Sequence, residues 1–281
     1  MAGGHLTVRN VEKTFGRRGA PMQALQPTCF DAKGGEFVAI VGPSGCGKST
    51  LLYIVAGLED ATGGTVAVDG ALVSEPGADR GMVFQNYTLF PWLNVLENSR
   101  FGGQLAANAP AYGMPVHEVA VRSERVGSLL ELMGLSDFLR AYPRELSGGM
   151  KQRVAIVRAL AGEPKVLLMD EPFGALDAQT REEMQELLLL VRRHWNTTIL
   201  FVTHDVDEAI FLADRVIVMT PRPGRMRADV RIDLPLERTL DQKLSPEFLS
   251  LKREIAGMLH ENRDTSDARQ TLLRRMFEQS V

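Results

Sequence analysis

A glycine-rich loop between an apolar run and a helical pattern constrains the fold of this chain more than any other feature. Residues 36–42, EFVAIVG, have the pattern of a strand buried on both faces, and the following KSTLLYIVAGL has helical spacing. The loop between them, GPSGCGKST at 42–50, matches the spacing G-x-x-x-x-G-K-[ST]. Glycines let backbone N–H groups wrap phosphate groups, and a helix N-terminus adds a favourable dipole. The sequence therefore predicts a nucleotide-binding loop; the alternative is a chance glycine-rich turn.

The residues of this loop have separate expected tasks. Lys48 would neutralise the β- and γ-phosphates, and the Ser49 hydroxyl would ligate Mg²⁺. Cys29 and Cys46 are the two cysteines of the chain and suggest neither a disulfide framework nor a zinc site, so Cys46 reads as a small residue in a tight loop. The residues expected to contact the nucleotide are Gly42, Pro43, Ser44, Gly45, Cys46, Gly47, Lys48, Ser49 and Thr50.

Short apolar runs alternate with helical patterns along most of the chain. The opening LTVRNVEKTFG alternates as a half-buried strand does, and TVAVDG, GMVFQ, KVLLMDE, TTILFVTH and RVIVMT are further strand candidates. Helical patterns are SERVGSLLELMG, GMKQRVAIVRALAG and AQTREEMQELLLLVRRHW. Because buried strands that alternate with helices are typical of parallel sheets, the sequence predicts an α/β fold with a mainly parallel core sheet.

Composition argues against several classes of protein. The net charge is −3, which disfavours nucleic acid as the main partner because binding to a phosphate backbone needs clustered positive charge. No apolar run approaches the roughly 20 residues of a membrane-spanning helix. The N-terminus MAGGHLTVRN lacks the apolar segment of a secretion signal. We therefore expect a cytoplasmic chain that does not itself cross a membrane.

Two adjacent carboxylates end one of the predicted strands. Asp170 follows four apolar residues in KVLLMDEP, where a carboxylate can reach the coordination shell of Mg²⁺. Glu171 is placed to take a proton from an attacking water. The alternative for the pair is a solvated turn.

A second glycine pair opens a helix at LSGGMKQR, residues 146–153. Ser147, Gly148 and Gly149 stand where a helix N-terminus attracts anions, although the chain already has one phosphate loop. The alternative is that these residues only cap the helix.

The motifs GPSGCGKST, LSGGMKQR, VLLMDEP, GALD and VTHD, in this order, resemble the ATP-binding subunits of ABC transporters. The resemblance runs from about residue 6 to beyond 260 and implies a P-loop NTPase fold with a helical signature subdomain, which binds ATP and Mg²⁺. It implies a homodimer whose copies face each other head to tail. The signature residues, which would cap the ATP held by Lys48 of the other copy, are Ser147, Gly148, Gly149 and Met150.

The resemblance also implies roles for single residues. Glu171 would be the general base, and His204 in FVTHD would contact the γ-phosphate and help position the water. Gln85, after GMVFQ, would sense Mg²⁺ and this water; a polar strand terminus is the alternative. Asp177 in GALD would communicate between the paired sites. Phe15 in VEKTF would stack on adenine, and its alternative is a core aromatic.

The segment NYTLFPWLNVLEN crowds Phe90, Trp92 and Leu93 around a proline and is expected to be too interrupted for a regular core helix. In the family this region forms part of the groove that receives a helix from the membrane subunit. A covered loop with its own apolar cluster is the alternative.

Several segments, among them LFPWLNVLEN, the TPRPGR turn and IDLPLER, resemble the nitrate, sulfonate and taurine importer branch. This implies the ATP-hydrolysing subunit of a bacterial importer at the cytoplasmic face of the membrane. Its partners would be transmembrane permease subunits and, indirectly, an extracytoplasmic solute-binding protein. Nucleic acid is not expected to be a partner. The alternative is a soluble ABC-type ATPase that takes no part in transport; in such a protein, tandem nucleotide domains or a basic insertion would be expected. A kinase or GTPase would leave LSGG and FVTHD without a role, and a silent scaffold would not need Lys48, Asp170, Glu171 and His204.

We expect an ATP-binding domain over 1–221, with a helical subdomain at about 86–160, and a C-terminal extension over 222–281. The extension contains a helical pattern capped by Ser245. The stretch 102–118, rich in Gly, Ala and Pro, reads as a surface excursion, and no function is assigned after about residue 262. The residues expected on one apolar face of the helix are Phe248, Leu251, Ile255, Met258 and Leu259.

Overall fold

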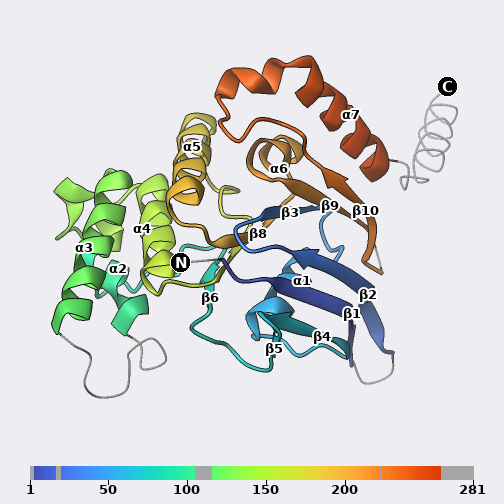
Figure 1. Ribbon diagram of the computed structural model, residues 1–281, viewed down its shortest axis with the longest axis horizontal. Helices are drawn as coiled ribbons and strands as arrows, with labels where there is room; N and C mark the ends of the chain where they lie inside the picture. The colour runs from blue at the N-terminus through green and yellow to red at the C-terminus, as the bar shows by residue number, and fades with distance from the viewer. Residues whose placement is uncertain (1–2, 17–19, 105–115, 222, 261–281) are drawn as a thin grey trace, which may run out of the picture.

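A computed structural model describes residues 3–16, 20–104, 116–221 and 223–260, with only the backbone of 104 and 116–123 (Figure 1). The strands are β1 (Leu6–Phe15), β2 (Met22–Ala32), β3 (Phe37–Val41), β4 (Gly63–Val68), β5 (Ala71–Leu72), β6 (Arg80–Val83), β7 (Val166–Asp170), β8 (Thr198–Thr203), β9 (Arg215–Thr220) and β10 (Arg225–Arg231). The α-helices are α1 (Lys48–Ala56), α2 (Val95–Gln104), α3 (Val116–Leu132), α4 (Gly148–Ala161), α5 (Ala178–His194), α6 (Val206–Leu212) and α7 (Pro246–His260). Short 3₁₀ helices are η1 (Ser136–Phe138), η2 (Pro143–Glu145) and η3 (Leu240–Leu244).

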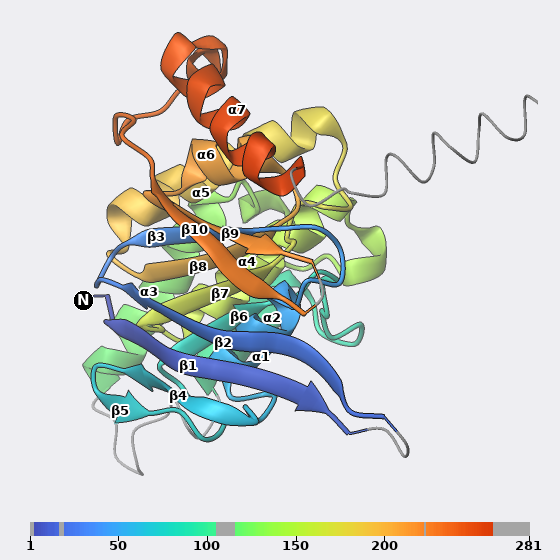
Figure 2. The same ribbon diagram turned by 90° about the vertical axis from the view of Figure 1, so that its right-hand side faces the viewer.

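These strands form two sheets. In the described ranges, the main sheet has six strands in the order β10-β9-β3-β8-β7-β6. Of these strands, β10 pairs antiparallel with β9, and all the other neighbours are parallel. The other sheet, β2-β1-β4-β5, is antiparallel and lies beside the first in the turned view (Figure 2). The expected α/β fold with a mainly parallel core sheet is confirmed.

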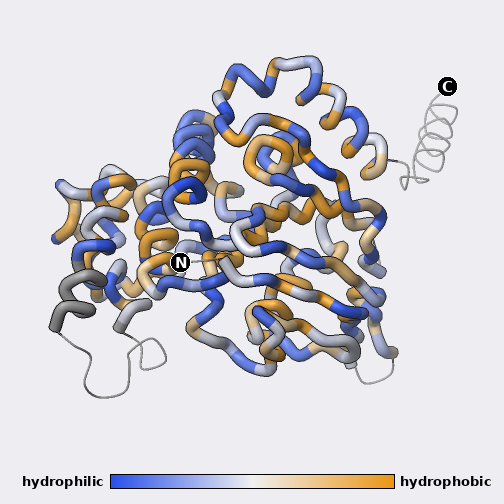
Figure 3. The backbone as a smooth tube through the Cα atoms, in the orientation of Figure 1, coloured by the Kyte–Doolittle hydropathy of each residue, from blue (hydrophilic) through white to orange (hydrophobic). Residues whose placement is uncertain are grey.

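The position of β3 between two apolar cores explains why its sequence is apolar at every position. Phe37, Ala39 and Val41 face one apolar core, together with residues of α4, α5 and α6. Val38 and Ile40 face the other core, around α1 and the antiparallel sheet. Because successive side chains of a strand point to opposite faces, a strand with a core on each side has no polar face. Figure 3 shows the central strands mainly hydrophobic, whereas α5 and α7 carry alternating polar and apolar segments.

The prediction that the segment 86–98 is too interrupted for a regular core helix holds for residues 86–94. It fails only at the end of the segment, where α2 begins at Val95. Asn94 Oδ1 accepts a hydrogen bond from the Glu97 amide at 2.9 Å, and the Glu97 carboxylate accepts one from the Asn94 amide at 2.8 Å. This reciprocal capping box was present in the sequence as N-V-L-E.

Among the described elements, strands β2, β5 and β10 and helices α2 and α6 had no counterpart among the sequence predictions. Strand β2 contains Pro27, and β10 is an edge strand whose charged and apolar residues alternate, so neither has the continuous apolar run of the central strands. Helix α6 has seven residues, which is too short for a clear helical period.

The segment after residue 221 continues the main sheet before it forms a helix. β10 pairs with β9, so the predicted boundary at 222 falls within a hairpin. Ser245 Oγ caps α7 by accepting a hydrogen bond from the Phe248 amide at 3.2 Å. Phe248 and Ile255 are buried in the core, and Leu251, Met258 and Leu259 pack against it, as expected. The predicted piece TLLRRMF and most of the stretch 102–118 lie outside the described residues.

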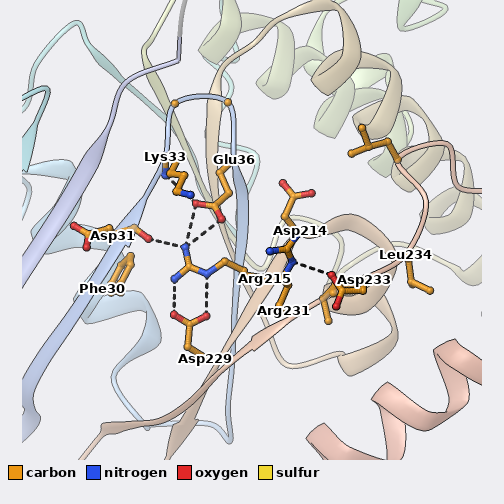
Figure 4. Close-up of a pocket in the computed structure, with 14 residues that line it drawn as sticks. Phe30, Asp31, Lys33, Glu36, Asp214, Arg215, Asp229, Arg231, Asp233 and Leu234 are labelled. Atoms are coloured by element: carbon orange, nitrogen blue, oxygen red, sulfur yellow. Dashed lines mark hydrogen bonds and ion pairs between the residues drawn. The ribbon is translucent and has the colours of Figure 1, made fainter.

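A charged cluster closes the amino ends of the central strands. Arg215 at the start of β9 donates to both carboxylate oxygens of Glu36 at 3.1 Å, to the Asp31 carbonyl at 2.9 Å and to Asp229 on β10 (Figure 4). The cluster lines a cavity of about 860 Å³. Its salt bridges join β9 to β10 and to Glu36 just before β3, and the hydrogen bond to the Asp31 carbonyl adds β2.

Candidate functional site

The loop at the carboxyl end of β3 has the conformation that its glycines allow. Gly47 has φ 89°, in the left-handed region, and immediately precedes α1. A Cβ on Gly42 would stand 2.7 Å from Cys46 Sγ and 2.8 Å from the Met219 carbonyl oxygen. Cys46 is buried, and this burial raises the pKa of its thiol. The predicted reading of Cys46 as a small residue in a tight loop agrees with this packing.

Lys48 at the start of α1 lies inside the loop and is 5% exposed. Its Nζ donates to the carbonyl oxygens of Gly42 at 2.8 Å and Pro43 at 3.3 Å. Glu171 Oε1 stands 4.0 Å from the same nitrogen. A cation held mainly by backbone carbonyls keeps its charge available for an anion at the loop.

The next residue, Ser49, meets the first of the paired carboxylates. Ser49 Oγ donates to Asp170 Oδ1 at 2.8 Å, and Asp170 is 2% exposed at the end of β7. A hydroxyl oxygen beside a carboxylate oxygen is a set of donors that suits Mg²⁺, which in such sites completes its shell with water and phosphate oxygens. These two side chains therefore fit the metal that the sequence predicts.

Glu171 has a strained backbone and a partner. Its φ is 42°, uncommon for a residue with a side chain, and its amide donates to the Val202 carbonyl on β8 at 2.8 Å. Glu171 Oε2 lies 2.9 Å from His204 Nδ1. Since an ionised carboxylate only accepts hydrogen bonds, Nδ1 is the donor. The structure thus brings Lys48, Glu171 and His204, predicted from three separate motifs, to one end of the sheet.

The remaining predicted residues stand around this centre. Gln85 is exposed in the bend after β6, and Phe15 is half-buried at the end of β1, with Lys13 Nζ 5.0 Å from its ring centroid. Asp177 caps α5, and its carboxylate accepts from the Thr180 amide at 3.0 Å. This bond lowers the pKa of Asp177.

The signature residues open α4, which lies beside the main sheet whereas α1 lies between the two sheets (Figure 1). Ser147 Oγ accepts a hydrogen bond from the Met150 amide at 3.2 Å, so this serine caps α4. A Cβ on Gly149 would stand 2.4 Å from Thr180 Cγ2 on α5, and one on Gly148 would stand 3.0 Å from the Tyr87 hydroxyl. The glycines therefore permit close packing of the start of α4 against Thr180 and Tyr87.

The segment around Phe90 lines a groove of about 520 Å³ beside α2 and α4. The Phe90 ring is 5.4 Å from that of Trp92 and 4.4 Å from that of Phe101. Trp92 is 69% exposed, and Leu93 is half-buried. Asn98, fully buried, bonds the Phe90 amide at 2.9 Å and the Leu93 carbonyl at 2.7 Å, which fixes the turn between them.

Two residues at this site were missed by sequence reasoning. Tyr53 lies four residues after Ser49 on α1; burial, and then its hydrogen bond to Asp170, raise the pKa of Tyr53 to about 12. Glu208 is buried in α6 and bonds Thr203 Oγ1 at 2.7 Å. The helical spacing from Ser49 was a usable signal for Tyr53, and an acidic residue in the apolar VDEAIFL was one for Glu208.

In the described part of the chain, no helix is both long and apolar enough to cross a bilayer.

Comparisons with known proteins agree with this geometry. The family model described as "ABC transporter" matches residues 25–174. The chain is 48% identical over 270 residues to the nitrate import ATP-binding protein NrtD of Synechocystis sp., covering 94% of this chain and 97% of that protein. It is 45% identical to the taurine import ATP-binding protein TauB of Rhizobium johnstonii, covering 90% and 95%. It is 42% identical to the aliphatic sulfonates import ATP-binding protein SsuB of Bacillus licheniformis, covering 89% and 92%.

A solved structure gives the same result. A dimeric post-hydrolysis state of the ATP-binding cassette MJ0796 bound to ADP and Pi has a TM-score of 0.69 and 32% identity, covering 82% of this chain and 100% of that one. The predicted P-loop NTPase fold and ATP as its ligand are therefore confirmed. The chain belongs to the ATP-hydrolysing, ATP-binding subunits of the ABC transporter family.

Proposed function

We propose that this chain is the ATP-hydrolysing subunit of a bacterial importer for a small anion of the nitrate, taurine or sulfonate class. The observation that carries the proposal is its similarity, over nearly the whole length of both chains, to ATP-binding subunits of nitrate, taurine and sulfonate importers. The solute would be bound by a separate solute-binding protein and by the permease, so none of the residues described here would touch it.

The cluster at the carboxyl ends of β7 and β8 supports a specific division of work. Glu171 accepts a proton from the water that attacks the γ-phosphate, and Lys48 neutralises the charge on the β- and γ-phosphates. His204 donates its Nδ1 proton to Glu171 in the structure, which orients the carboxylate and leaves Nε2 for the γ-phosphate or the water. The shared position of these residues supports the roles proposed for them.

Ser49, Asp170 and Gln85 are the proposed residues for Mg²⁺. The bond between Ser49 Oγ and Asp170 supports the first two, and Gln85 is exposed in the bend after β6. When bound, Mg²⁺ would neutralise charge on the β- and γ-phosphate oxygens.

Two copies would hold two ATP molecules between them. The N-terminus of α4, with Ser147, Gly148, Gly149 and Met150, would face the γ-phosphate held by the other copy. Asp177 would stand at the contact between the sites, and the half-buried ring of Phe15 would stack on adenine. Such an arrangement requires both copies for each hydrolytic centre.

The groove beside Phe90 is the proposed seat of a permease helix. Phe90 lines the groove, and the exposed Trp92 beside it and the half-buried Leu93 would be apolar contacts for an incoming helix. The chain would thereby reside at the cytoplasmic face of the membrane. We place the ATP-binding domain at 1–221, with its helical subdomain at about 86–160, and treat 222–281 as an extension continuous with the main sheet.

The test is ATP hydrolysis by the complex with its permease and solute-binding protein in liposomes. Nitrate, taurine or an alkanesulfonate should stimulate hydrolysis several-fold, and Trp92→Glu should abolish this stimulation while the isolated subunit still binds ATP. Leu72→Glu is the matched control, because Leu72 is 71% exposed on β5, away from the groove. If the chain copurifies with the permease but none of these anions stimulates hydrolysis, the proposed class of solute is wrong. If the chain does not copurify with the permease, its proposed role in an importer is wrong.

A further inference from the structure

Glu208 is a buried carboxylate that the roles above do not use. It lies in the first turn of α6 and is 5% exposed. Thr203, the residue before His204, donates its hydroxyl proton to Glu208 Oε2 at 2.7 Å. The same hydroxyl oxygen accepts from the amide of Asp205, the residue after His204, at 3.0 Å. Glu208 thus holds the backbone on both sides of His204 through one hydroxyl.

The other carboxylate oxygen of Glu208 faces a different loop. Arg181 Nε on α5 is 3.6 Å from Glu208 Oε1, and Arg181 Nη2 donates to the Leu176 carbonyl at 2.9 Å. Leu176 immediately precedes Asp177, which caps α5. Arg181 Nε is buried without a hydrogen-bond partner among the described residues. A small movement of either helix would therefore turn the ion pair into a hydrogen bond.

We propose that Glu208 is a positioning residue that links the segment carrying His204 to the loop carrying Asp177 within one subunit. A shift of the Asp177 loop when it meets the other copy would reach His204 through Leu176, Arg181, Glu208 and Thr203. This inference rests on the proposed roles of His204 and Asp177.

The carboxylate of Glu208 is ionised at neutral pH although its burial disfavours the charged form. Burial, partly opposed by the Thr203 hydrogen bond, raises the pKa of Glu208 to about 6. The charged groups that act on it are Asp205 and His204 beside it and Arg181 on α5, while Lys252 of α7 pairs with Asp207 instead. A carboxylate kept ionised in a buried position is a common sign of a functional task.

The first test is Glu208→Gln in the full-length chain, with Mg²⁺ and ATP. The amide can still accept from Thr203 but cannot pair ionically with Arg181. We expect kcat to fall about tenfold, KM to stay within about twofold and the cooperativity for ATP to decrease. The unfolding temperature should not fall, because the variant no longer buries a charge. Glu163→Gln, which breaks an ion pair with Arg125 at 3.1 Å, is the control and should keep kcat.

The second readout is the pH profile. The folded pKa of Glu208 lies above its ordinary value of 4.5, so the wild type loses this charge as pH falls through about 6. The ratio of variant to wild-type kcat should therefore rise toward one at pH 5.5. The double variant Arg181→Ala/Glu208→Gln should lose no more kcat than the more impaired of the two single variants.

Wild-type kcat and cooperativity in Glu208→Gln would overturn the link, as would strict additivity with Arg181→Ala. A parallel loss of kcat and unfolding temperature would also overturn it, because it would indicate a merely structural role. Failure of the proposed importer function has a different signature: hydrolysis by the wild-type complex would not respond to nitrate, taurine or sulfonate.

Discussion

The two ends of the main sheet hold charge in opposite ways. At the amino ends, Arg215 is bonded to Asp229, Glu36 and the Asp31 carbonyl, and the bonds to Asp229 and Glu36 raise the pKa of its guanidinium. At the carboxyl ends, Lys48 bonds to backbone carbonyls and stays 4.0 Å from Glu171. At the amino ends, the charged side chains pair with one another and hold the strands together. At the carboxyl ends, the cation and the carboxylate are held apart and remain available to phosphate and water. The comparison predicts activity effects at one end and stability effects at the other.

The largest effect is expected from Glu171→Gln at the carboxyl ends. Removing the general base should lower the turnover of ATP by about 10²-fold or more, while ATP binding is kept. The glutamine oxygen can still accept from His204 Nδ1, so the fold around it should persist. Steady-state hydrolysis and equilibrium nucleotide binding measure the two quantities. Turnover near that of the wild type would remove Glu171 from its proposed role.

A smaller effect, on stability, is expected from Arg215→Met at the amino ends. Losing the cation leaves Glu36 and Asp229 facing each other and should lower the free energy of unfolding by about 1–3 kcal/mol. Hydrolysis per folded molecule should stay within about twofold. Urea denaturation and steady-state hydrolysis check this pair of outcomes.

Lys48→Met is the matched variant at the other end. It replaces a buried cation by an apolar side chain of similar length and should weaken ATP binding with little change in the free energy of unfolding. If Arg215→Met and Lys48→Met had the same profile of stability and activity, the contrast between the two ends would be wrong.

The smallest effect is expected from Tyr53→Phe, which removes the hydroxyl bonded to Asp170. We expect kcat to change by no more than about threefold. The folded pKa of about 12 lies above the ordinary value of 10, so the wild type should lose stability as pH rises from 10 through 12. Tyr53→Phe should lack this loss. Absorbance at alkaline pH and unfolding temperature test it, and a phenol that titrates near 10 would contradict the assignment.

Local patterns predicted the parts of the site that are local in sequence. The phosphate loop lies between an all-apolar strand and a helix, and Asp170 and Glu171 directly follow a run of four apolar residues in β7, so both could be read from the sequence. The contact of Tyr53 with Asp170 and that of Arg181 with Glu208 join residues far apart in the chain. Their distances depend on how α1, α5 and α6 pack, which periodicity does not give.

Strands β2 and β10 were missed for a related reason. Their formation depends on neighbours rather than on their own composition: β2 pairs with β1, and β10 completes the edge of the main sheet beside β9. The alternation of charged and apolar residues in β10 was a usable signal, whereas β2 is interrupted by Pro27.

The contact between Gly149 and Thr180 has a mechanical consequence. The first turn of α4 and the first turn of α5 touch where a single methyl group would not fit. The glycine-rich opening of α4 therefore packs directly against the first turn of α5, which Asp177 caps. A residue larger than glycine at position 149 would push apart the two segments expected to face a second copy.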